Sequence, residues 1–291
     1  MSSNHWITTT ECSVLGVIIA EKTRKMQYKS NQTVNLHYQR FGQNKNPPLL
    51  ILPGLFGSIA NWRSIIRDLS EDFEVIAVDM RNHGQSPWAD SMDYREMAED
   101  IANLILTLKL PRPALLGHSM GGKIAMMLAQ LDLISIGKLI VADIAPFSYQ
   151  HSHQHLVTAM LQLDLVNSSS RSDVDAQLAE TIAESGIRQF LLQNLKRVDD
   201  KYQWRINLQA IGNNMEILLG YSGSGTANHS TLFLAGENSD YITPNMQSDI
   251  LSMFPKAEFK SIPDAGHWLH AEQPATFLRL TRNFLLHSTA P

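Results

Sequence analysis

Short apolar runs alternate with amphipathic segments along most of this 291-residue chain, and no other sequence feature constrains its fold as strongly. Near-continuous apolar runs predict strands that are buried on both faces, at residues 49–52, 74–78, 114–117, 138–143, 231–235 and 258–262. Helix-spaced apolar positions predict helices at residues 62–69, 94–108, 120–130, 246–254 and 274–286. Strands that alternate with helices in this way predict an α/β fold, with a mostly parallel central sheet flanked by helices.

The alternation is interrupted between residues 147 and 226, where apolar positions keep a helical spacing and no strand pattern is visible. This segment ends in a Gly/Ser-rich run at residues 222–225. We therefore expect one α/β core, made of residues 26–146 and 227–291, with a helical cap at residues 147–226. Residues 1–25 show no amphipathic pattern and are expected to be a dispensable N-terminal extension, with Met26 as an alternative start.

Charge and cysteine content exclude several classes of partner. The formal net charge is -4, so the sequence lacks the excess of lysine and arginine by which proteins usually bind nucleic acids and anionic lipids. Cys12 is the single cysteine, and no Cys/His cluster has zinc spacing, which excludes an intrachain disulfide and a structural zinc site. The apolar run at residues 14–20 is too short to span a bilayer. We expect a cytoplasmic protein with no structural zinc site and no nucleic acid or membrane partner.

The sequence Gly-His-Ser-Met-Gly at residues 117–121 reads G-x-S-x-G, and it lies between a predicted strand and a predicted helix. In this context the motif predicts a sharp turn that lifts the Ser119 hydroxyl above the sheet. Gly117 and Gly121 are required because side chains there would collide with the neighbouring strand and helix. The amide of Met120 starts the helix and can therefore stabilise a developing oxyanion.

A serine nucleophile needs a base, and His267 is the best candidate because it follows the last predicted strand. His270 is the nearest rival and is expected to be structural. His151, His153 and His155 could suggest a metal site, but no Asp or Glu lies close by in the sequence, so we interpret them as solvated residues at a helix start. The polar cluster at residues 81–86 follows a strand and is assigned a structural role in its turn.

An oxyanion hole also needs a second amide donor. The Gly-rich turn at residues 53–58 follows the first strand of the predicted core, where this donor is expected, so Leu55 or Phe56 would supply it. The acid that orients His267 has two candidates, because chain order permits both Asp143 and Asp240.

These motifs together resemble the α/β-hydrolase superfamily over nearly all of the chain after residue 25. More narrowly, GLFGS at 54–58, DMRNHGQSP at 79–87, GHSMGGK at 117–123, DIAP at 143–146 and AGHWLHAE at 265–272 are similar to the YbfF-type small bacterial esterases. The chain departs from many relatives at Pro53, where they carry a histidine before the glycine.

The resemblance implies an α/β-hydrolase fold and hydrolysis of short- to medium-chain carboxylic esters or acyl thioesters, without a cofactor. It favours Asp143 as the acid, because DIAP matches the relocated acid of the family, whereas Asp240 falls one residue beyond the usual place. It also implies a cap over an acyl pocket, for which Phe190, Leu192, Trp204 and Trp268 are candidate lining residues.

Two alternatives to an esterase remain open at this stage. A carbon–carbon bond hydrolase of the same fold also uses serine and histidine. A ligand-binding protein on a hydrolase scaffold would need no activated serine, since a fold alone does not establish chemistry.

Overall fold

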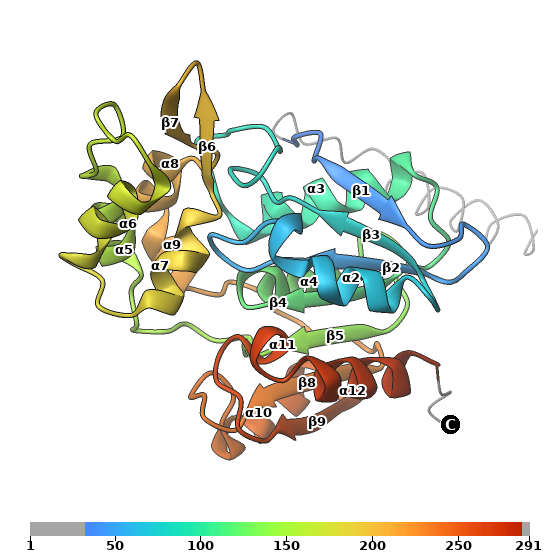
Figure 1. Ribbon diagram of the computed structural model, residues 1–291. Helices are drawn as coiled ribbons and strands as arrows, with labels where there is room; N and C mark the ends of the chain where they lie inside the picture. Colours follow the sequence, from blue (N-terminus) through green and yellow to red (C-terminus); the bar gives the residue numbers. More distant parts are fainter. Residues whose placement is uncertain (1–32, 287–291) are drawn as a thin grey trace, which may run out of the picture. The chain divides into compact units, whose positions relative to one another are not determined.

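The computed structural model describes residues 33–286, and its centre is a seven-stranded sheet in the order β1-β3-β2-β4-β5-β8-β9 (Figure 1). β1 pairs antiparallel with β3, and every other neighbouring pair in this sheet is parallel. The strands are β1 (Tyr38–Phe41), β2 (Pro48–Leu52), β3 (Glu74–Val78), β4 (Ala114–His118), β5 (Leu139–Ala142), β8 (Thr231–Gly236) and β9 (Ala257–Ile262). The predicted mostly parallel sheet is confirmed.

Helices cover both faces of the sheet, and each face has its own hydrophobic core. On one face pack α3 (Tyr94–Thr107), α4 (Met120–Leu131) and α10 (Gln247–Met253), the last of which follows the short η2 (Pro244–Met246). On the other pack η1 (Ile59–Trp62), α2 (Arg63–Leu69), α11 (Leu269–Glu272) and α12 (Pro274–Leu286). Within β2, Leu50 and Leu52 belong to the first core, and Leu49 and Ile51 belong to the second. This explains why the strand reads as a continuous apolar run.

The segment between β5 and β8 follows the carboxyl end of β5 and carries elements of its own, drawn in yellow and brown tones in Figure 1. It holds α5 (Gln154–Leu161), α6 (Arg171–Ala179), α7 (Ser185–Leu192), β6 (Leu195–Val198), β7 (Lys201–Trp204), α8 (Leu208–Asn213) and α9 (Met215–Leu219). We refer to residues 147–226 as the insertion. Besides the expected helices, it contains two strands that no sequence pattern indicated, because β6 and β7 form an antiparallel hairpin.

The turn of this hairpin is made by Asp199 and Asp200, both of which have positive φ angles, 46° and 63°. Two consecutive residues with positive φ are what a tight two-residue hairpin turn needs, and Asp tolerates that conformation better than most residues.

The end of the insertion is attached to α4, the helix that begins directly after Ser119. Lys123 Nζ donates hydrogen bonds to the carbonyl oxygens of Leu219 (2.9 Å) and Gly220 (2.7 Å). The amide of Tyr149, at the start of the insertion, donates to the same Leu219 carbonyl at 3.0 Å. Burial lowers the pKa of Lys123 to about 7, because the carbonyls supply no counter-charge for its ammonium. The two connections of the insertion thus meet beside α4.

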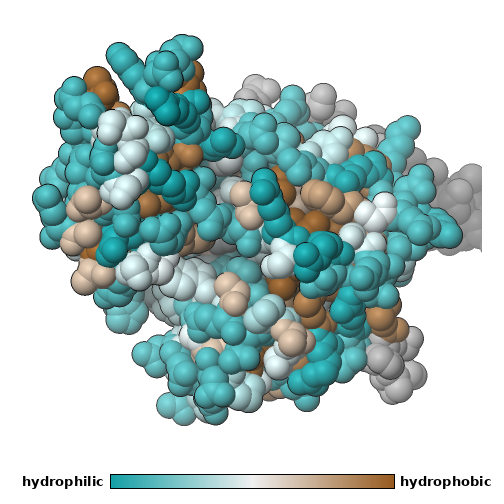
Figure 2. All heavy atoms as spheres, viewed as in Figure 1, coloured by the Kyte–Doolittle hydropathy of each residue, from teal (hydrophilic) through white to brown (hydrophobic). Residues whose placement is uncertain are grey.

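Residues 1–25 and Met26, for which the sequence predicts a dispensable extension and an alternative start, lie outside the described residues. Within residues 33–286, none of the helices combines the length and apolar character needed to cross a bilayer. The face shown in Figure 2 is mostly hydrophilic, with small, separate hydrophobic groups.

Candidate active site

Ser119 lies between β4 and α4 in a backbone conformation that few residues adopt, with φ 53° and ψ -119°. Close packing enforces this turn. A Cβ on Gly117 would lie 2.3 Å from the Gly121 carbonyl oxygen, and a Cβ on Gly121 would lie 2.1 Å from the Leu52 carbonyl oxygen. Glycine is therefore the residue that fits at both positions. The Ser119 amide donates to Ala142 at 3.0 Å, which ties the turn to the end of β5.

His267 and Asp143 are in direct contact. The Nδ1 atom of His267 lies 2.8 Å from Asp143 Oδ2, and the Asp143 side chain is fully buried whereas that of His267 is 24% exposed. A carboxylate only accepts hydrogen bonds, so Nδ1 carries a proton, and Nε2 is the acceptor whenever the ring is neutral. His267 also stacks on the ring of Tyr241, at a centroid separation of 4.2 Å. These two contacts fix the orientation of the imidazole ring.

The Asp143 carboxylate accepts two more hydrogen bonds, from the Gly236 amide (2.9 Å) and the Ser239 hydroxyl (2.5 Å). Gly236 is the last residue of β8 and Ser239 follows it, so the carboxylate links the ends of β5 and β8. Asp240, the other sequence candidate, is exposed and lies beside a wider cavity that His267 also lines. Among residues 33–286, the carboxylate that accepts a hydrogen bond from His267 is that of Asp143.

The two amides predicted for the Gly-rich turn differ in availability. The Phe56 amide donates to His83 Nε2 at 3.1 Å, so the expectation that it could serve as an oxyanion donor is wrong. In the described part of the chain, neither backbone nor side chain accepts from the Leu55 amide. Gly54 allows this turn to approach Ser119 closely, since a Cβ there would lie 3.1 Å from Ser119 Cβ. Leu55 and Met120 are therefore the amides available beside Ser119.

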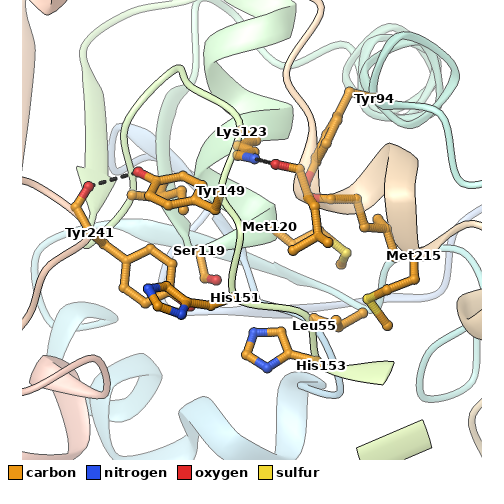
Figure 3. Close-up of a pocket in the computed structure, with 13 residues that line it drawn as sticks. Leu55, Tyr94, Ser119, Met120, Lys123, Tyr149, His151, His153, Met215 and Tyr241 are labelled. Atoms are coloured by element: carbon orange, nitrogen blue, oxygen red, sulfur yellow. Dashed lines mark hydrogen bonds between the residues drawn. The ribbon is translucent and has the colours of Figure 1, made fainter. Parts of the chain in front are cut away.

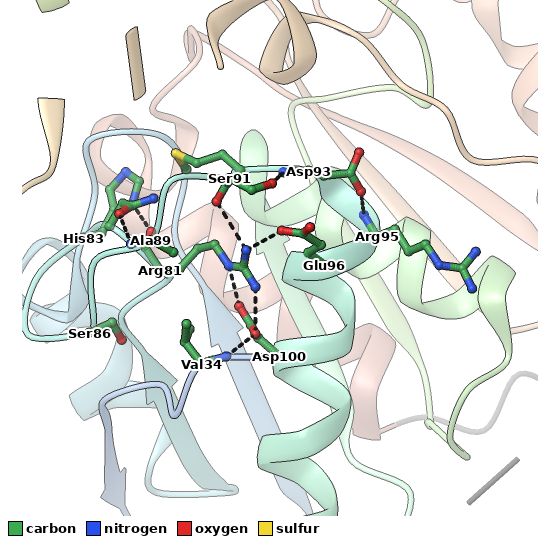
Figure 4. A network of polar contacts seen from close by, with 12 residues as sticks. Val34, Arg81, His83, Ser86, Ala89, Ser91, Asp93, Arg95, Glu96 and Asp100 are labelled. Atoms are coloured by element: carbon green, nitrogen blue, oxygen red, sulfur yellow. Dashed lines mark hydrogen bonds and ion pairs between the residues drawn. The ribbon is translucent and has the colours of Figure 1, made fainter. Parts of the chain in front are cut away.

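His83, which accepts from the Phe56 amide, belongs to a polar network with Arg81 at its centre (Figure 4). His83 Nδ1 donates to the Arg81 carbonyl at 2.9 Å, which leaves Nε2 as the acceptor for Phe56. Burial lowers the pKa of His83 to about 4, so the ring stays neutral. The Arg81 guanidinium forms a bidentate pair with Asp100, at 2.7 and 2.9 Å, and also contacts Glu96. The structural role predicted for residues 81–86 is thus to position the turn beside Ser119.

Two cavities meet at Ser119. The Lys123 cavity extends along α4 and is lined mainly by apolar and aromatic side chains, among them Met120, Lys123, Tyr94, Met215 and Tyr241 (Figure 3). The His267 cavity is lined by the Gly-rich turn, His118, Leu156, Phe190, His267 and Trp268. Leu55, Ser119 and His153 line both cavities. No hydrogen bond joins Ser119 to His267 among the described residues, but both line the His267 cavity, and such contacts often tighten only with substrate.

The predicted pocket residues divide into two groups. Phe190 and Trp268 line the His267 cavity, and their rings lie 5.5 Å apart. Leu192 and Trp204 line neither of the two cavities beside Ser119, so their assignment to the pocket is wrong. Leu192 is fully buried in the core, and the Trp204 indole donates to the Met160 carbonyl at 3.2 Å. Both pack the insertion.

The remaining histidines also separate by position. His270 is buried and stacked on Trp62 at 4.0 Å, in agreement with a structural role. His118 donates from Nε2 to the His267 carbonyl at 2.8 Å, and so supports the loop that carries His267. The interpretation of all three insertion histidines as solvated is wrong for His153, which lines both cavities. Among residues 33–286, no three His, Cys, Asp or Glu residues gather in a way that could hold a metal ion.

The sheet, the strained serine turn and the paired His267 and Asp143 define an α/β-hydrolase, and the chain belongs to that family. The sequence model of the protein family described as the alpha/beta hydrolase fold matches residues 47–165.

Within this family, the chain is 36% identical to Esterase YbfF of Escherichia coli over 244 residues, which cover 84% of this chain and 94% of that protein. It is also 36% identical over 280 residues to the sn-1-specific diacylglycerol lipase ABHD11 of Danio rerio, with 93% of this chain and 88% of the relative covered. A solved structure described as a marine microorganism esterase has a TM-score of 0.83 and 39% identity, and covers 87% of this chain and all of that one. These relatives are named esterases or lipases, which supports hydrolysis of ester bonds.

Proposed function

We propose that this chain is a serine esterase that hydrolyses short- to medium-chain carboxylic esters, acyl thioesters included, through an acyl-enzyme on Ser119. The observation that carries this proposal is the 2.8 Å contact between Asp143 and His267 on the wall of a cavity that Ser119 also lines. A serine hydroxyl is too weakly acidic to attack an ester unaided, and an oriented neutral imidazole supplies the base it needs.

In the first half-reaction, His267 Nε2 takes the Ser119 proton while Oγ bonds to the ester carbonyl carbon. The carbonyl oxygen becomes an oxyanion, which the Leu55 and Met120 amides stabilise. The imidazolium then gives its proton to the alkoxy oxygen, the carbon–oxygen bond breaks, and the alcohol leaves. Asp143 keeps the proton-bearing Nδ1 of His267 in place and stabilises the transient positive charge.

In the second half-reaction, His267 takes a proton from water while the water oxygen bonds to the acyl carbon. The imidazolium then gives a proton to Ser119 Oγ as the bond between Oγ and the acyl carbon breaks, and the carboxylic acid leaves. Neither half-reaction requires a metal or an organic cofactor.

The two cavities suit the two parts of an ester. We assign the acyl group to the Lys123 cavity, because its walls are largely apolar. Lys123 follows Ser119 by four residues, about one helical turn, and its side chain lines this cavity, so we expect a polar group in the wall to favour short acyl chains. The alcohol or thiol is assigned to the His267 cavity, because His267 must reach the leaving group. Residues 147–226 then act as a cap that closes both cavities.

The test is a fluorophosphonate probe together with turnover of p-nitrophenyl butyrate. We expect the probe to label Ser119 and the Ser119→Ala variant to lose about a millionfold in turnover. Ser185→Ala, at an exposed serine of the insertion, is the matched control and should keep full activity. Turnover close to that of the unaltered protein in Ser119→Ala would refute the mechanism. Faster cleavage of a diketone than of any ester would favour a carbon–carbon bond hydrolase instead.

A further inference from the structure

His153 is the third residue that both cavities share, beside Ser119 and Leu55. In the proposed mechanism Ser119 is the nucleophile and Leu55 is an oxyanion donor. His153 comes from the insertion rather than the core, and no step described above uses it.

The position of the ring assigns it to the leaving-group side of the site. His153 immediately precedes α5, and its ring makes an edge contact with Phe56, at 6.5 Å and 76°. Phe56 lines the His267 cavity and not the Lys123 cavity. Leu156, one turn further along the same helix, also lines the His267 cavity. This side of α5 therefore faces the cavity assigned to the alcohol.

The ring nitrogens of His153 are available to a ligand. Among residues 33–286, no side chain or backbone group forms a hydrogen bond with either nitrogen. Burial, followed by the charges of His267, His155 and His151, lowers the pKa of His153 to about 4. A neutral imidazole has one N–H donor and one acceptor, and a polar group in a partly buried site is stabilised when a ligand engages it.

An ester bound at the junction of the two cavities offers two oxygen atoms. The carbonyl oxygen is already held by the Leu55 and Met120 amides. The alkoxy oxygen lies toward His267 and gains negative charge as the carbon–oxygen bond breaks.

We propose that His153 binds the substrate directly and donates a hydrogen bond to the alkoxy oxygen of the ester, an inference that rests on the proposed function. The contact supports departure of poor leaving groups. The preferred substrates are then esters of ordinary alkyl alcohols, because p-nitrophenolate and thiolates are weaker bases than alkoxides and leave without such assistance.

The experiment compares kcat/KM for ethyl butyrate and p-nitrophenyl butyrate in His153→Leu, His153→Gln and the unaltered protein. We expect His153→Leu to lose about 10-fold to 100-fold with ethyl butyrate and at most about 3-fold with p-nitrophenyl butyrate. His153→Gln keeps an N–H donor and should restore most of the ethyl butyrate rate. His155→Leu, at an exposed histidine in α5, is the matched control and should leave both rates unchanged.

The ratio of the two rates does not depend on the fraction of folded enzyme, so partial unfolding of a variant cannot produce the expected result. An equal loss with both esters, or no loss with either, would overturn the role of His153 while leaving the esterase intact. Absence of turnover in the unaltered protein would refute the proposed function, and this inference with it.

Discussion

Asp143 takes the place beside His267 from an unusual backbone conformation. It follows β5 directly, with a φ of 51°, and its amide donates to the Leu234 carbonyl at 2.8 Å. This turn directs the carboxylate across the end of β8, where Ser239 occupies the position at which we expected a typical acid of the superfamily. Ser239 instead donates its hydroxyl proton to Asp143. The serine at the usual position of the acid therefore supports the Asp143 carboxylate by a hydrogen bond.

The two candidate acids can be compared directly in matched variants. Asp143→Asn should reduce kcat for p-nitrophenyl butyrate about ten-thousandfold, because an amide favours the wrong imidazole tautomer and does not stabilise the imidazolium. Asp240→Asn should change kcat by less than about twofold, since exposed substitutions outside a site have small effects. Active-site titration corrects both rates for folded enzyme. A severe loss in Asp240→Asn beside an active Asp143→Asn would reverse the assignment.

At the scale of single elements, α7 contributes side chains to two different environments. Phe190 faces the His267 cavity, whereas Leu192, two residues further on, is fully buried between the insertion and the core. Two residues in a helix are about 200° apart around the axis, so they point in nearly opposite directions. Sequence similarity to a cap could not separate them, because the docking of the helix decides which side faces the cavity.

Substitutions in α7 should therefore have different effects. Phe190→Ala enlarges the leaving-group cavity and should change the ratio of kcat/KM for ethyl and benzyl butyrate, with a nearly unchanged free energy of unfolding. Leu192→Ala removes buried methyl groups and should lower the free energy of unfolding by about 2–5 kcal/mol without changing that ratio. Urea unfolding and the two substrates provide the measurements. If Leu192→Ala alone altered the ratio of kcat/KM for the two esters, the assignment of Phe190 to the cavity and of Leu192 to the core would be contradicted.

Local patterns predicted the elements whose signals are strong. The apolar strands and the Gly117-x-Ser119-x-Gly121 turn follow from short sequence windows. The β6–β7 hairpin was missed because its strands are four residues long and rich in Lys and Arg, although the Asp199-Asp200 pair is a usable turn signal. The bond from Phe56 to His83 joins residues 27 positions apart, and only tertiary packing reveals it.

At the scale of the whole molecule, several buried histidines make stability depend on pH. Burial lowers the pKa of His83 to about 4 and that of His270 to about 3, and it also lowers the pKa of His118. The unfolded chain binds protons on these rings near pH 6.5, whereas the folded chain does not. The unfolded state thus gains protons first as pH falls, and folding stability decreases from about pH 6.5 downward.

The contribution of His83 can be isolated by proton uptake on unfolding. At pH 5 the unaltered protein should take up about one more proton on unfolding than His83→Gln does. Complete titration of this ring is worth about 3 kcal/mol between pH 6.5 and pH 4. Urea unfolding at a series of pH values measures the slope, with the exposed His155→Gln as the control. Equal proton uptake by His83→Gln and the unaltered protein would show that His83 is protonated in the folded state.

The bonds from Lys123 to Leu219 and Gly220, with the bond from Tyr149 to Leu219, hold the two connections of the insertion together beside α4. Because α4 begins directly after Ser119, the base of the insertion is fixed to the helix that positions this serine. Away from this base, Phe190 of the insertion and Trp268 of the core lie with their ring centroids 5.5 Å apart. An opening of the insertion therefore has to separate these two rings, while the hydrogen bonds at its base can stay in place.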